Sequence, residues 1–152
     1  MNSEADGLLI IGYGSSLRGD DDAGPQVARQ LRRRGFSAIE THQLTPELAQ
    51  EISSARVALF VDADAAVEPG RIRVGTVPDS SSSPFDHQVS PSSLVQLTRE
   101  LYGRAPAALL LAIGGACYEV GAGLSTPVRR AVRGAVDGVA SAARTVFDFR
   151  RR

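Results

Sequence analysis

The sequence predicts an α/β fold in which helices cover both faces of a mostly parallel sheet. Short, continuous apolar runs, typical of strands buried on both faces, occur at residues 8–11, 57–61 and 107–113. Amphipathic stretches separate these runs, so strands and helices alternate along the chain. No repeat or linker interrupts the alternation, and 152 residues fit one domain, which we place at residues 1–152.

The first strand is expected at residues 8–11 and ends in a glycine-rich turn. A polar segment with three consecutive aspartates follows it. Pro25 suits the first position of a helix because it has no N–H to leave unpaired there, and Gly35 suits its end. Residues 36–41 predict a second, shorter strand.

The middle of the chain predicts a short helix and two strands. Thr45 and Pro46 are typical of an N-cap and a first helical residue, with the helix reaching about Ser53. The run at 57–61 is the third strand and ends at an aspartate. Residues 72–77 alternate in polarity, which indicates a half-exposed strand at an edge of the sheet.

The last third of the chain predicts two helices around one more strand. Ser90 and Pro91 begin the first helix, residues 107–113 form the strand, and a second helix runs from residues 125–127 to about Phe149. The predicted order of strands and helices therefore matches a sheet with helices on both sides.

Composition excludes several classes of protein. The chain is 43% hydrophobic and 22% charged, which argues against a disordered chain, a collagen or a coiled coil. Its 17 basic and 17 acidic residues cancel, whereas a nucleic-acid binder is normally basic. A single cysteine cannot form an internal disulfide, and no leader or membrane-spanning run precedes the first strand. We therefore expect a cytoplasmic protein that binds neither nucleic acid nor membrane.

Acidic side chains follow two predicted strands at their carboxyl ends. Asp20, Asp21 and Asp22 lie after the first strand, and Asp62 ends the third. Ligands of open parallel sheets bind beyond the carboxyl ends of the strands, where the strand order reverses. If the two strands are neighbours, the carboxylates converge, and His87 can reach the same edge. Two carboxylates and an imidazole form a divalent-metal site with open positions.

Each of these residues also has a simpler explanation. Aspartates before a helix commonly form a solvated turn that compensates the helix dipole. Acidic residues at the end of a strand often cap their own backbone, and a single loop histidine is usually a surface residue. The spacing alone leaves the metal site and these explanations open.

Two further patterns suggest other chemistry. A strand followed by Gly12-Tyr13-Gly14, with Glu40 near the end of the second strand, is similar to part of a dinucleotide-binding motif. The third glycine of that motif is misplaced, and the three aspartates would repel a pyrophosphate. Cys117 follows a strand end, but a cysteine without a placed base is more often buried, so we expect a structural role.

The segment from the first strand to the first helix has the pattern Gly12-x-Gly14-x-x-Leu17-x-Gly19-Asp20-Asp21-x-Ala23-Gly24-Pro25. This pattern resembles the N-terminal signature of the hydrogenase maturation endopeptidases. Three further stretches agree in order: Phe60-Val61-Asp62-Ala63, His87 seven residues before Leu94, and Gly121-x-Gly123-Leu124-Ser125. The resemblance covers nearly the whole chain, and the first motif is fairly specific.

The resemblance implies a three-layer α/β/α sandwich on a twisted, mostly parallel five-stranded sheet. Members of the family remove a short C-terminal extension from the nickel-loaded precursor of the large subunit of nickel–iron hydrogenases. The resemblance also implies that Asp21, Asp62 and His87 bind a metal, which is the nickel carried by the precursor, and that zinc or cadmium can occupy the site. The same residues are the catalytic candidates, with Asp21 or Asp62 as base. Whether the metal or a carboxylate activates the attacking water stays open.

Two segments depart from the family pattern. Ser15 stands where many members have asparagine, and His42-Gln43-Leu44 stands where many have Asp-Gly-Gly. We expect His42 to lie close to the residues that bind the metal. The two departures bear on which hydrogenase is processed, and they leave the three metal-binding residues in place. The alternative function is a non-catalytic metal- or nucleotide-binding module on the same α/β fold.

Overall fold

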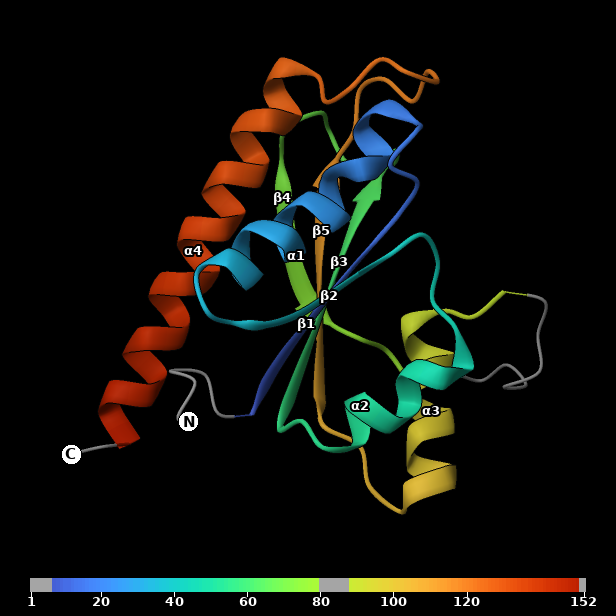
Figure 1. The fold of residues 1–152 in the computed structure, drawn as a ribbon, viewed down its shortest axis with the longest axis vertical. Coiled ribbons are helices and arrows are strands. Elements are labelled where there is room, and N and C mark those ends of the chain that lie inside the picture. The colour runs from blue at the N-terminus through green and yellow to red at the C-terminus, as the bar shows by residue number, and fades with distance from the viewer. Residues whose placement is uncertain (1–6, 80–87, 151–152) are drawn as a thin grey trace.

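A five-stranded sheet forms the centre of the computed structural model, which describes residues 7–79 and 88–150 (Figure 1). Its strands are β1 (Leu8–Tyr13), β2 (Ser37–Thr41), β3 (Val57–Asp64), β4 (Ile72–Thr76) and β5 (Ala107–Gly114). They lie in the order β2-β1-β3-β5-β4. The pairs β1–β2, β1–β3 and β3–β5 are parallel, and β4 pairs with β5 in the antiparallel direction.

This topology confirms the predicted mostly parallel sheet and the position of its exposed edge. The segment predicted at 72–77 is β4, an edge strand that ends at Thr76. The chain passes from β1 to β2 on one side and then returns to β3 on the other side of β1. The strand order therefore reverses between β1 and β3, the place where ligands of such sheets bind.

Helices cover both faces of the sheet, as predicted (Figure 1). α1 (Ala23–Arg33) and α4 (Thr126–Arg150) pack on one face, and α2 (Ala49–Ser53) and α3 (Pro91–Tyr102) on the other. Successive side chains of a strand point to opposite faces of the sheet, so Ile10 packs with α1 and α4 whereas Ile11 packs with α2 and α3. The result is the three-layer α/β/α sandwich.

Three local details differ from the sequence-based expectation. The turn after β1 contains a 3-10 helix, η1 (Gly19–Asp22), and α1 begins before Pro25, which still lies in the first turn where its missing N–H costs nothing. A second 3-10 helix, η2 (Pro46–Leu48), precedes α2. β3 continues beyond its predicted end, so Asp62 lies within the strand.

The start of α3 shows why this segment is helical. The hydroxyl of Ser90 accepts a hydrogen bond from the N–H of Ser93, the hydroxyl of Ser93 accepts one from the N–H of Ser90, and Pro91 occupies the first turn.

Within the described part of the chain, no helix combines the length and the apolar character that crossing a membrane requires.

Candidate functional site

Glycines allow the start of α1 to lie directly on the ends of β1 and β3. A Cβ atom on Gly24 would overlap the carbonyl oxygen of Val61 in β3, and one on Gly12 would overlap the carbonyl oxygen of Gly24. Any larger residue would push the helix away from the sheet. This close approach brings the aspartates of η1 to the point where the strand order reverses.

The three consecutive aspartates point to three different places. A 3-10 helix has about three residues per turn, so successive side chains lie about a third of a turn apart. Asp20 bonds to the loop between β5 and α4, Asp21 to the N–H of Ser15, and Asp22 to the side chain of Gln26. Adjacent residues of one type thus have separate roles.

Asp20 is fully buried and joins two distant loops. Its Oδ2 accepts hydrogen bonds from the N–H of Ala116 at 2.8 Å, the N–H of Cys117 at 2.9 Å and the hydroxyl of Ser125 at 2.8 Å. Its Oδ1 accepts from the N–H of Ser125 at 2.7 Å. Burial opposes ionisation, but these donors outweigh it, so the pKa of Asp20 lies below its ordinary value. Asp20 is a structural carboxylate, a role that its sequence position did not reveal.

Asp62 lies in a contrasting environment beside Asp21. Burial is the largest cause that raises the pKa of Asp62 to about 6, and the charges of Asp21 and Asp64 raise it further. A hydrogen bond from the phenol of Tyr13 and one from the N–H of Ala63 act in the opposite direction. The pair β1–β3 is in register at Gly12 and Val61, so Tyr13 and Asp62 are the next residues along neighbouring strands.

Two of the three predicted site residues are therefore brought together. Asp21 is half-buried, and its Oδ2 accepts the N–H of Ser15 at 2.7 Å, which fixes its carboxylate close enough to Asp62 to raise the pKa of the latter. His87 lies outside the described residues. Among residues 7–79 and 88–150, no three His, Cys, Asp or Glu side chains are grouped so that they could hold a metal ion.

Sequence reasoning missed two tyrosines at this edge. Tyr13 bonds to Asp62, and the parallel pairing of the two strands could have indicated this contact. The hydroxyl of Tyr118 is buried against Gly115 and has no hydrogen-bond partner among the described residues. Burial is the largest cause that raises the pKa of the Tyr118 phenol. The charges of four aspartates raise it further, namely Asp20, Asp21, Asp62 and Asp64. No sequence signal could have placed Tyr118, because it depends on the path of the loop after β5.

The other residues that the sequence singled out take structural or exposed positions. Cys117 is half-buried rather than buried, and its carbonyl oxygen accepts the N–H of Asp20 at 2.8 Å. His42 is exposed just after β2. Both oxygens of Glu40 accept hydrogen bonds from the guanidinium groups of Arg29 and Arg32. The acidic group that a dinucleotide ribose would need is therefore already engaged.

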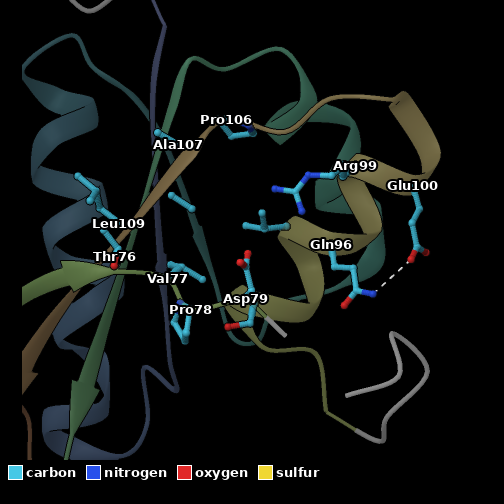
Figure 2. A pocket seen from close by; sticks show the side chains of 13 residues that line it. Thr76, Val77, Pro78, Asp79, Gln96, Arg99, Glu100, Pro106, Ala107 and Leu109 are labelled. Carbon is cyan, nitrogen blue, oxygen red and sulfur yellow. Dashed lines mark hydrogen bonds between the residues drawn. The ribbon is translucent and has the colours of Figure 1, made fainter. Parts of the chain in front are cut away.

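A separate cavity of about 640 Å³ lies between α3, the end of β4 and the start of β5. Figure 2 shows that Asp79, Gln96 and Arg99 border it, with Gln96 bonded to Glu100. This cavity is at the amino end of β5, whereas the aspartates lie beyond the carboxyl ends of β1 and β3. It is therefore distinct from the candidate site.

Solved structures of several maturation proteases are similar to this chain over most of its length. [NiFe] hydrogenase maturation protease HybD from Thermococcus kodakarensis is 20% identical with a TM-score of 0.71, over 90% of this chain and 98% of that one. Hydrogenase maturating endopeptidase HybD from E. coli is 19% identical with a TM-score of 0.72, over 91% and 93%. Hydrogenase 2 maturation peptidase from a Thaumarchaeota archaeon is 24% identical with a TM-score of 0.65, over 89% and 96%.

These likenesses confirm the fold that the sequence resemblance implied. No protein-family model matches the chain, and no curated protein is similar enough in sequence to count as a match. The chain therefore shares its fold, nearly end to end, with proteins that are named as maturation proteases.

Proposed function

We propose that this protein is a hydrogenase maturation endopeptidase. It removes a short C-terminal extension from the nickel-loaded precursor of the large subunit of a nickel–iron hydrogenase. The observation that carries the proposal is the pair Asp21 and Asp62, which lies where the strand order reverses in a fold shared with maturation proteases. The pKa of Asp62, raised to about 6, supports a role in proton transfer.

Asp62 is the general base of the proposed reaction. In the metal-free protein, a carboxyl group with a pKa of about 6 is mostly ionised at neutral pH, yet it accepts a proton more readily than an ordinary aspartate. It takes a proton from the water whose oxygen attacks the scissile carbonyl carbon. The same proton then passes to the peptide nitrogen as the carbon–nitrogen bond breaks. Tyr13 holds the Asp62 carboxylate in place through its hydrogen bond.

Asp21, Asp62 and His87 contact the nickel ion that the precursor carries. Two carboxylates and an imidazole are ligands that suit a divalent ion and leave positions open for other groups. The ion supplies charge that polarises the scissile carbonyl and fixes the precursor relative to the base. Zinc or cadmium is expected to bind to the same residues when no precursor is present.

The test is cleavage of two forms of the precursor, one loaded with nickel and one free of metal. The protein is incubated with each form, and mass spectrometry follows the loss of the C-terminal extension. Cleavage of the loaded form only, with no activity on casein, is the expected result. Equal cleavage of both forms would show that recognition lies in the peptide. Binding of the loaded precursor without any cleavage would instead support the non-catalytic module.

A further inference from the structure

The edge strand β4 carries unpaired backbone groups on its outer side. Just before the strand, the carbonyl oxygen of Arg71 accepts the N–H of Gly114. Just after it, the N–H of Val77 donates to the carbonyl oxygen of Ala108, so the odd-numbered residues of this segment bond to β5. In an antiparallel pair, the backbone groups of successive residues point to opposite sides. The N–H and C=O groups of three residues therefore point away from the sheet, namely Ile72, Val74 and Thr76.

This outer side of β4 is open. Edge strands are commonly protected by several charges, a proline or a covering segment. β4 has one charged residue, Arg73, and no proline. Its residues 73–76 are exposed, Val74 to 62%, and in the described part of the chain no backbone group outside β5 bonds to it. At the opposite edge, β2 carries Glu40, whose carboxylate is bonded to Arg29 and Arg32. β4 is therefore the edge that can accept another strand.

The flank of α4 beside β4 leaves room for a second molecule. A Cβ atom on Gly134 would lie 4.0 Å from Cδ1 of Ile72, so this side of the helix faces the edge strand. Gly138 and Ala142 follow at intervals of four residues, which keeps them close to the same side, and all three are exposed. Over this stretch, α4 presents no large side chain that would keep another strand away from β4.

We propose that two copies of this chain pair through β4 in the antiparallel direction. Pairing about the middle of the strand places Val74 of one copy opposite Val74 of the other, and Ile72 opposite Thr76. All three residues with outward backbone groups then meet a partner within the strand, which no shifted register achieves. Arg73 lies opposite Gly75, which has no side chain, so no like charges face each other.

The occupant is a second copy because the edge is complementary to itself. Such a pairing is isologous and closes after two copies. Five residue pairs bury less than the roughly 1,200–2,000 Å² of a standard interface, so the dimer is weak and forms at high protein concentration. β5 separates β4 from the candidate site between β1 and β3, and antiparallel pairing opens the two sites at opposite ends of the joined sheet. The proposal is independent of the proposed function.

The first test is the mass of the protein by sedimentation equilibrium from about 10 µM to about 1 mM, the range of weak association. The mass should rise with concentration from 16.0 kDa toward twice that value. Val74→Pro removes an N–H that points outward and no hydrogen bond to β5, so it should fold and stay monomeric. Val74→Thr is the matched control, because threonine keeps the N–H and the branched Cβ, and it should dimerise like the wild type.

The second test addresses the register. Gly75→Glu would place a carboxylate opposite Arg73 of the other copy, whereas Gly75→Arg would place a second guanidinium there. A Cβ atom on Gly75 meets nothing within 4 Å, so both variants should fold. The dimer Kd should fall about threefold or more in Gly75→Glu and rise about threefold or more in Gly75→Arg. Circular dichroism checks that each variant is folded.

Three results would overturn the proposal. The first is a wild type that keeps the monomer mass at every concentration, and if Val74→Pro then lost binding to the precursor, the edge would take a peptide instead. The second is a dimer that a folded Val74→Pro leaves intact, which would place the interface elsewhere. The third is an equal Kd for Gly75→Glu and Gly75→Arg, which stays decisive even if Val74→Pro does not fold.

Discussion

Asp20 and Asp62 lie at the same edge of the sheet, yet their surroundings are opposite. Asp20 is fully buried and accepts four hydrogen bonds, from Ala116, Cys117 and twice from Ser125, so its pKa is lowered. Asp62 is half-buried, has a carboxylate neighbour, and its pKa is raised to about 6. Burial opposes ionisation of both groups. The number of donors decides which of the two stays charged and which can exchange a proton.

The comparison separates a structural carboxylate from a reactive one at the same edge of the sheet. The carboxylate of Asp20 fixes the loop after β5 onto η1. Asp62, supplied with fewer donors, keeps the proton affinity that a base requires. The reactive carboxylate is thus the one that receives fewer hydrogen bonds from the rest of the fold.

Asp62→Asn is expected to have the largest effect, on activity. Removal of a general base typically costs a factor of about 10² to 10⁴ in rate. Processing of the nickel-loaded precursor, followed by mass spectrometry, should therefore fall by that amount. Asp64→Asn is the matched control, because Asp64 bonds to the N–H of Ala66 through an oxygen that asparagine retains. Comparable losses in the two variants would contradict the special position of Asp62.

Asp62→Asn lowers activity, but it should make the fold more stable relative to the wild type as the pH rises. The folded state binds the proton of Asp62 up to a pH of about 6, whereas an ordinary aspartate releases it near about 4. The folded state therefore holds more protons in this range, and the wild type loses stability relative to Asp62→Asn as the pH rises from about 4 to about 6. Thermal unfolding at several pH values measures this difference.

Asp20→Asn is expected to have the next largest effect, on stability. The NH₂ group of the asparagine amide would face the hydrogen-bond donors of the loop after β5. We expect this to lower the free energy of unfolding by about 2–4 kcal/mol. For a chain of 152 residues this corresponds to a fall in Tm of about 5–15 °C. Asp22→Asn, a neighbour that bonds only to Gln26 among the described residues, should cost less than about 1 kcal/mol. Equal losses of stability in the two variants would contradict the structural role of Asp20.

Tyr13→Phe is expected to have a smaller effect on both activity and its pH dependence. The lost hydrogen bond is worth about 0.5–1.5 kcal/mol, so kcat should fall about three- to tenfold. Because this bond lowers the pKa of Asp62, its removal should shift the acid limb of the activity profile to higher pH. Tyr102→Phe, at the exposed end of α3, is the control. A loss of activity without a pH shift would argue that Tyr13 acts on something other than Asp62.

Cys117→Ser is expected to have almost no effect. Only the backbone of Cys117 takes part in the bonds with Asp20, and serine keeps that backbone. Processing activity should stay within about twofold, and thiol-alkylating reagents should inhibit weakly. Complete loss of activity in a folded variant would revive Cys117 as a nucleophile.

The sequence could predict the edge at which the site lies, but not the role of each aspartate. Continuous apolar runs and parallel strands were sufficient to bring Asp21 and Asp62 to one place. The function of Asp20 depends on Ser125, which is 105 residues away, and local patterns carry no information on such a contact. The 3-10 turn decides which aspartate faces β3, and the sequence predicted only a polar turn there.

The most direct test of this contrast is an NMR titration of the aspartate carboxyl carbons, with Asp20→Asn and Asp62→Asn used for assignment. The titration runs from about pH 2 to about pH 8, which covers both sides of the ordinary aspartate pKa. The expected result is a midpoint of about 6 for Asp62 and a midpoint below the ordinary value for Asp20. An ordinary midpoint for Asp62, or a reversed order of the two groups, would contradict the division between a structural and a reactive carboxylate.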